Sequence, residues 1–399
     1  FLTTHPATDL TKADTPKRAI FRSAFLLALL HAVVLAGGSL FFVAEEPPEN
    51  IATPQQLAMA ILKAESPLWA RGWYHWDALW LVHLSKMGYR LEIFPDGTLW
   101  NSNVAFLPGI PAVASTLSRL GLNPWAGVLL FNVLADFLLM LGLGWLALDL
   151  TGSVRASLWA MLAMVAWPWH FFVITPYQEA AGLAAIVWSL WLIRQNRLIP
   201  AFLLALLASL FRLTAIGLYA GLIGGAALVA LIDRSKWRES RGIIMASLGC
   251  FVGWQGLMLY FRQRFGDAQI GIKVQQAWGR DMPHLTGPIE SLASAFQGVL
   301  TGSAWLDWFA SVLVLLSLVF VRRELGLVWA SGQFVLVAQA LSTGMVVSSG
   351  RYMLTAIPFF ITAGILADRR TRLVLPCLAL SGVLQVMLLW RYGHGQFAG

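Results

Sequence analysis

Residues 72–111 read GWYHWDALWLVHLSKMGYRLEIFPDGTLWNSNVAFLPGIP, and they separate the first long apolar run of the chain from all later ones. Asp77 lies here among aromatic residues. Apolar side chains recur around it at helical spacing, at positions 76, 79, 80, 84 and 87, with polar ones at 75, 83, 85 and 86. We therefore expect an amphipathic helix that lies flat on a bilayer surface and holds the Asp77 carboxylate at headgroup level.

Composition indicates an all-α polytopic membrane protein. Of 399 residues, 58% are hydrophobic and 12% are charged, against about 25% charged in soluble domains. Several apolar runs exceed the roughly 18 residues that suffice to cross a bilayer. The net charge of +8 comes from basic residues in short loops, which the positive-inside bias explains. Without a soluble basic domain, nucleic-acid binding is excluded.

Several kinds of site are missing from the sequence. Cys250 and Cys377 both fall inside apolar runs, so no disulfide framework is expected. The cysteines and seven histidines show no metal-ligand spacing, and we predict neither a protein-built metal site nor a cofactor. There is no P-loop, no G-x-G-x-x-G and no D-x-D. These motifs would bind a nucleotide or a nucleotide-linked sugar. If the protein transfers a sugar, it would therefore have to take that sugar from a lipid carrier.

The basic loops predict the topology of a single domain, 1–399. Residues 1–16 should be flexible, and the run 24–43 should be a retained anchor with its N-terminal side in the cytoplasm. Residues 44–103 and 262–300 become two extracytoplasmic loops. Twelve apolar stretches occur, yet the loops require an odd number of crossings, so we expect 11–12 transmembrane helices. The short, proline-interrupted stretch 104–120 is the one that we suspect does not cross.

This topology gathers one acid and several basic residues on the extracytoplasmic side. The run 198–232 is too long for one span, so we expect two helices meeting at a corner that holds Arg212. Arginine's planar fork matches phosphate oxygens, and the set therefore suits an anionic lipid. Structural roles stay open for each residue: Asp77 and Glu179 as helix caps, Arg351 as a snorkelling residue. Asp136 and His170 are interpreted as buried packing residues.

A series of motifs resembles the GPI mannosyltransferase II (PIG-V) family and its prokaryotic relatives, within the GT-C membrane glycosyltransferases. The motifs cover about residues 70–360 in order: W-D-A at 76–78 with G-Y at 88–89, A-F-L-P-G-I-P at 105–111, W-P at 167–168, T-P-Y-Q-E at 175–179, R-L-T-A-I-G at 212–217, Q-Q-A-W-G-R at 275–280, and S-G-R-Y at 349–352 with Pro358. His75 stands where the family usually has Arg, and Gln178 where it often has Thr.

The resemblance implies a GT-C fold and an inverting glycosyltransferase. Mannose would pass from a polyprenyl-phosphate-mannose donor to a membrane-associated lipid or glycan acceptor and give an α-mannoside. Asp77 would be the catalytic base. The phosphate of the donor would bind Arg351 as the first candidate, followed by Arg280 and then Arg212. We expect substrate contacts from His75, Trp76, Tyr177, Glu179, Gln276, Trp278 and Tyr352. The apolar segment 104–111 would wall a groove for the polyprenyl tail.

The partners follow from the same resemblance, and the location follows from the basic, compact loops. The partners would be membrane lipids, the lipid-linked donor and the acceptor, and the protein would act as a monomer. The active site would be extracytoplasmic, in a bacterial or archaeal plasma membrane or in the ER membrane of a eukaryote. Three alternatives stay open: a GT-C transferase for another polyprenyl-phosphate sugar, a lipid or sugar transporter (flippase), and a non-catalytic assembly subunit. A transporter would favour paired midplane charges and an internal repeat, and the sequence shows no repeat.

Overall fold

A computed structural model describes residues 10–42, 61, 63, 64, 66–94, 96–300 and 302–398, with side chains from residue 15 onward. The described chain is helical, and its only β pairing is a single bridge between Ile93 and Leu99. The longer helices are α1 (Leu10–Phe41), α4 (Asp77–Met87), α5 (Gly109–Arg119), α6 (Pro124–Thr151), α7 (Val154–Val165), α8 (Glu179–Arg194), α9 (Leu198–Phe211), α10 (Thr214–Ile232), α11 (Trp237–Phe265), α14 (Ala304–Leu316), α15 (Leu318–Leu325), α16 (Leu327–Ala340), α18 (Ile357–Arg369) and α19 (Thr371–Gly393). Short segments connect them: α3 (Leu68–Arg71), η1 (Asn103–Ala105), η2 (His170–Val173), η3 (Arg234–Lys236), α12 (Ile270–Lys273), η4 (Val274–Trp278), α13 (Gly287–Ala293), η5 (Ser294–Phe296), α17 (Ser349–Tyr352) and η6 (Met353–Thr355).

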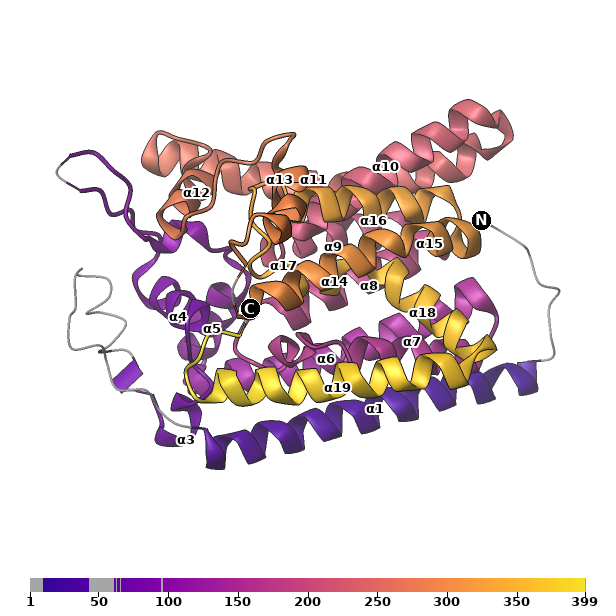
Figure 1. The fold of residues 1–399 in the computed structure, drawn as a ribbon, viewed down its shortest axis with the longest axis horizontal. Coiled ribbons are helices and arrows are strands. Elements are labelled where there is room, and N and C mark those ends of the chain that lie inside the picture. Colours follow the sequence, from indigo (N-terminus) through magenta and orange to yellow (C-terminus); the bar gives the residue numbers. More distant parts are fainter. Residues whose placement is uncertain are drawn as a thin grey trace.

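The long helices run side by side along the longest dimension of the molecule (Figure 1). At one end, which we call the loop end, lie α3, α4, α5, α12, α13 and α17 (Figure 1). The opposite, basic end is joined by ion pairs between helix termini. Arg155 of α7 meets Asp368 of α18 at 3.2 Å, and Arg369 meets Glu324 at 2.7 Å. The chain therefore passes repeatedly between a basic end and a loop end.

Six helices in the described residues are long and apolar enough to cross a membrane, or seven if the bent pair 349–355 and 357–369 is one span. The protein is thus an all-α, multi-pass membrane protein. Shorter apolar helices, α7, α9 and α16, lie in the same bundle. The predicted total of 11–12 crossings exceeds the six or seven helices of full length, because several predicted runs end as helices of 11 to 16 residues. The suspected stretch 104–120 contains only the 11-residue α5, about 16 Å long.

Small residues let the helices of the bundle approach closely. A Cβ atom on Gly221 of α10 would lie 2.2 Å from the backbone oxygen of Ser331 in α16. On α11, a Cβ on Gly249 would lie 2.0 Å from the backbone oxygen of Phe202 in α9. Contacts of this kind are typical of helix packing in lipid, where van der Waals packing drives association. The outer helices α1 and α19 expose many apolar side chains, as a lipid-facing surface does.

Three expectations from the sequence need comment. The segment predicted to be flexible, 1–16, overlaps α1, which begins at Leu10; residues 1–9 lie outside the described part. The run 198–232 does break into two helices, α9 and α10, with Arg212 between them. The helix α4 exists, but much of its polar face is buried. His83, on that face, is 2% exposed and bonds Asn103 at 3.0 Å, because η1 and α5 pack over the helix.

Candidate active site

Asp77 is the first residue of α4, where the helix dipole favours a carboxylate. The preceding residue, Trp76, has φ of +51°, a strained conformation for a bulky side chain. This sharp turn starts the helix at Asp77. It also leaves the Trp76 side chain 43% exposed, edge-on to the ring of Phe397. The Asp77 side chain is 34% exposed, so its carboxylate can meet a ligand.

Arg351 is the direct partner of Asp77. Its Nη1 donates to Asp77 Oδ2 at 2.9 Å, although 274 residues separate the two. The guanidinium lies over the rings of Phe172, Tyr177 and Tyr352, at 5.2, 5.4 and 5.6 Å from their centroids. The arginine side chain is only 12% exposed. The structure therefore brings the predicted base and the first predicted phosphate ligand into contact within an aromatic box.

Glu179 extends this pair into a longer network. Its Oε1 lies 3.4 Å from Arg351 Nε and 3.0 Å from Arg212 Nη1. Arg212 also donates to Thr355 Oγ1 at 3.0 Å and to the Arg351 carbonyl at 3.1 Å. Acids and arginines thus alternate from Asp77 to Arg351, Glu179 and Arg212. We call these four residues the carboxylate–arginine chain; its formal charge is zero.

Asp307 of α14 forms hydrogen bonds with the backbone of the turn that carries Arg351. This fully buried carboxylate accepts the backbone N–H groups of Ser348, at 3.1 Å, and Gly350, at 2.8 Å. Trp167 Nε1 donates to the Gly350 carbonyl at 2.9 Å, so the turn is held from two sides. Sequence reasoning missed Asp307. An acid inside the apolar run 303–320 was the signal that pointed to it.

Two predicted substrate-binding residues are buried, unlike the partly exposed Asp77. His75 and Tyr177 are 1% and 3% exposed, and the Tyr177 hydroxyl donates to the His75 carbonyl at 3.1 Å. Burial, together with the charge of Lys63, lowers the pKa of His75 to about 4. Tyr392, near the end of the chain, completes this layer by donating to the Trp73 carbonyl at 2.6 Å. No local pattern could have predicted Tyr392, because its partner is 319 residues away.

Arg280 also lies close to Tyr352. Its guanidinium is 5.5 Å from the centroid of that ring and donates to the Val347 carbonyl at 3.2 Å. Within the described residues Arg280 forms no ion pair, so its charge is free for a ligand. Trp278 packs against Trp80 of α4, 5.7 Å between centroids, while Gln276 is exposed. Two cations, Arg280 and Arg351, therefore lie close to the Tyr352 ring.

A narrow apolar crevice lies along α4, starting beside the residue that follows Asp77. Side chains of three helices and the loops before α4 and α8 line it: Tyr74, Ala78, Leu81, Val82, Ser85, Ile110, Ala114, Pro124, Trp125, Val128 and Pro176. Ile110 belongs to the segment 104–111 that was predicted to wall a lipid groove. The crevice does not include the Asp77 carboxylate, so polar and apolar parts are adjacent but distinct.

Comparison with known proteins adds no relative. No protein-family model matches the chain, and no curated protein matches it significantly. The fold and the site together define an all-α, multi-pass membrane protein with an acid–arginine network at one end of its bundle. Residues that could hold a metal ion lie elsewhere, in a buried cluster described below.

Proposed function

We propose that this protein is an inverting GT-C glycosyltransferase that moves mannose from a polyprenyl-phosphate-mannose donor to a membrane-bound acceptor. The observation that carries the proposal is the contact of the partly exposed Asp77 carboxylate with Arg351 at 2.9 Å. One group can take a proton and the other can hold a phosphate, side by side at one end of a membrane bundle. The ordered motifs that resemble the PIG-V family support the same reaction.

The proposed step needs one base and no second carboxylate nucleophile. The acceptor hydroxyl gives its proton to Asp77 as its oxygen forms a bond to the anomeric carbon of the donor sugar. The bond from that carbon to the phosphate oxygen breaks on the opposite face, and polyprenyl phosphate leaves with the electron pair. The configuration inverts. The leaving phosphate gains one negative charge, so it requires cations and not a general acid.

Arg351 and Arg280 are the residues that would supply this positive charge. Both lie within 6 Å of the Tyr352 ring, and Arg280 has no competing ion pair in the described structure. Arg351 is shared between Asp77 and Glu179. When a phosphate competes for its guanidinium, the Asp77 carboxylate becomes freer to accept a proton. Arg212 is buried on Glu179, which favours a positioning role over the phosphate contact that we first expected.

The donor's lipid tail and the side of the membrane fit the same proposal. The crevice along α4 is apolar and begins next to Asp77, but it has room for little more than one water molecule, so a polyprenyl tail would have to widen it. Basic residues such as Arg194, Lys236 and Arg322 lie at helix termini of the basic end. The positive-inside rule then puts the loop end outside the cytoplasm. A lipid-linked donor is the sugar source available on that side.

A transfer assay tests the proposal. Purified protein receives radiolabelled polyprenyl-phosphate mannose and a total lipid extract, beside Asp77→Asn and the matched control Asp281→Asn, an exposed acid of the second loop. We expect label in a new lipid or glycan with wild type and control, and a loss of about 10²–10⁴-fold with Asp77→Asn, the usual contribution of a general base. Substantial transfer by Asp77→Asn would sink the mechanism. Transfer only from a glucose or arabinose donor would change the sugar and keep the site.

One observation favours a transporter as the second candidate. Asp136 lies near the middle of α6 and contacts two histidines, and such midplane groups are common in ion-coupled transport. A flux assay in liposomes separates the two functions. Lipid or sugar movement that survives Asp77→Asn, with no transfer from any lipid-linked sugar, would favour the transporter.

A further inference from the structure

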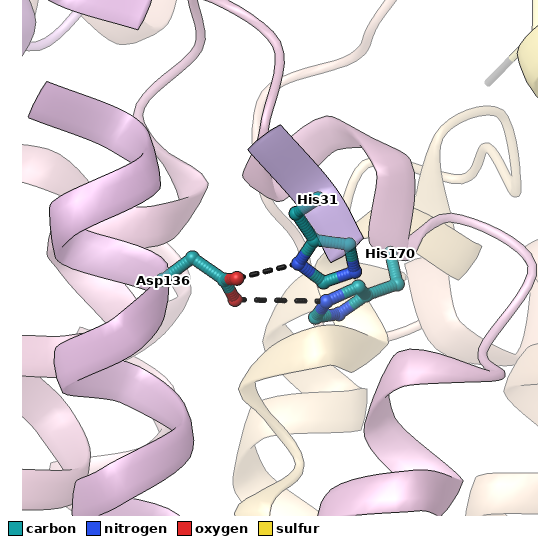
Figure 2. A group of neighbouring side chains, drawn as sticks. All are labelled: His31, Asp136 and His170. Atoms are coloured by element: carbon teal, nitrogen blue, oxygen red, sulfur yellow. Dashed lines mark hydrogen bonds and ion pairs between the residues drawn. The ribbon is translucent and has the colours of Figure 1, made fainter. Parts of the chain in front are cut away.

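Three residues from distant parts of the chain meet in the core, away from the carboxylate–arginine chain. Figure 2 shows His31 of α1 and His170 of η2 on one side of Asp136 of α6. His31 Nδ1 lies 2.5 Å from Asp136 Oδ2, and His170 Nε2 lies 3.7 Å from Asp136 Oδ1. The two imidazole rings are 5.1 Å apart. All three residues are buried, at 5%, 0% and 0% exposed.

The hydrogen bonds of this cluster are incomplete. His31 satisfies one oxygen of Asp136, but Asp136 Oδ1 and both ring nitrogens of His170 have no hydrogen-bond partner among the described residues. Buried polar atoms are nearly always paired, because leaving them unpaired in an apolar core is costly. The unpaired oxygen and His170 Nε2 point toward each other across a 3.7 Å gap (Figure 2). A cation held between these two atoms would satisfy both.

We propose that His31, Asp136 and His170 bind a divalent transition-metal ion, with zinc as the reference ion. Two imidazoles and one carboxylate are ligands that zinc prefers, and three protein ligands leave one position open. The ligand atoms lie within 4.8 Å of one another. Tetrahedral bonds of about 2.0–2.1 Å put ligand atoms about 3.4 Å apart, so small side-chain rotations complete the site. One ion would satisfy Asp136 Oδ1 and His170 Nε2 together.

The ion would fasten three segments that the chain brings together only in the folded state. His170 begins the buried segment that leads to Phe172 and Tyr177, whose rings lie under Arg351. One turn before Asp136, Asn132 also binds this segment, through the carbonyls of Thr175 and Tyr177. The site thus anchors the wall of the candidate active site. Metal binding is independent of the proposed sugar transfer, so each can fail without the other.

The test measures metal on the full chain in detergent after removal of any purification tag. Protein is stripped with a chelator, dialysed against zinc or cobalt(II), passed over a desalting column and analysed by elemental mass spectrometry. Wild type is compared with Asp136→Asn, His170→Ala and the control His284→Ala, which removes a partly exposed histidine outside the cluster. We expect about one zinc per chain in wild type and control, and the loss of most of this zinc in the two cluster variants.

A second measurement needs no variant, in case a variant does not fold. X-ray absorption of the zinc-loaded wild type should show two imidazole ligands and oxygen at about 2.0–2.1 Å, and the cobalt form should show visible absorption typical of a tetrahedral site. Wild type that takes up no metal, or a spectrum without imidazole ligands, overturns the proposal. Equal uptake by wild type and folded cluster variants does the same. The three residues would then be a hydrogen-bonded packing cluster.

Discussion

Replacing Arg351 with methionine should lower the stability of the folded protein as well as its activity. The change removes the cation that lies 2.9 Å from Asp77 and 3.4 Å from Glu179. At an effective dielectric constant of about 20, these two contacts are worth ~6 and ~5 kcal/mol before the cost of desolvating the ions. That cost cancels much of the sum, and removing one partner of a buried pair leaves a net loss of ~3–5 kcal/mol. The Asp77 side chain is one-third exposed and can be rehydrated, so we expect a loss of about 3 kcal/mol.

The assay is the free energy of unfolding in mixed micelles, measured for a double-mutant cycle. In the variant Arg351→Met with Glu179→Gln, the carboxylate that Arg351 contacts is removed together with the arginine, so the double variant should recover at least ~1 kcal/mol relative to the sum of the single changes. The matched control is Arg155→Met, which breaks an ion pair with Asp368 whose arginine side chain is 64% exposed. Such pairs are worth ~0–1 kcal/mol.

Two results would refute this reasoning. A loss below about 1 kcal/mol for Arg351→Met would show that the ion pairs contribute no more than a surface pair does. Strict additivity in the double-mutant cycle would show that Arg351 and Glu179 do not stabilise each other. Either result would also weaken the view that phosphate competes with Asp77 for one guanidinium.

Three further predictions concern the support of the site. Asp307→Asn keeps the side chain's size but cannot accept both N–H groups of the Arg351 turn; we expect the KM for the donor to rise about tenfold, from the loss of roughly 1.5 kcal/mol, with a smaller change in kcat. Gly350→Ala places a Cβ 2.4 Å from the Trp169 indole and should lower the unfolding free energy by ~1–3 kcal/mol. The pKa of His75 is lowered to about 4 in the fold, whereas the unfolded chain takes up this proton near pH 6.5. Stability should therefore fall as the pH drops from 6.5 toward 4, by about 2.5 kcal/mol at pH 4.5, and His75→Gln should remove this part of the pH dependence.

Each of these has its own control. Asp307→Asn with an unchanged KM would deny the carboxylate a positioning role. For Gly350→Ala the control is Gly256→Ala in α11, where a Cβ meets nothing within 4 Å; equal effects of the two changes would contradict the close packing. Wild type and His75→Gln with parallel pH curves between 7 and 4.5 would show that His75 is protonated in the fold as easily as in the unfolded chain.

The sequence alone determined the class of the protein and much of its helix pattern. Hydropathy is a local property, so long apolar runs predicted the spans, and the charge of Arg212 predicted the break between α9 and α10. The aromatic setting of Asp77 and the arginines near loops predicted which residues would meet at one end. Asp77 and Arg351 do meet, with Glu179 and Arg212 beside them.

Only the tertiary structure decided which partner each group has. Asp307, Tyr392 and the cluster of His31, Asp136 and His170 act through contacts that span tens to hundreds of residues. No periodicity encodes such contacts, because they depend on how whole helices cross and on where small residues allow close approach. The burial of α4 was missed for the same reason: an amphipathic pattern shows which face is apolar, while the segments that cover its polar face come from elsewhere in the chain.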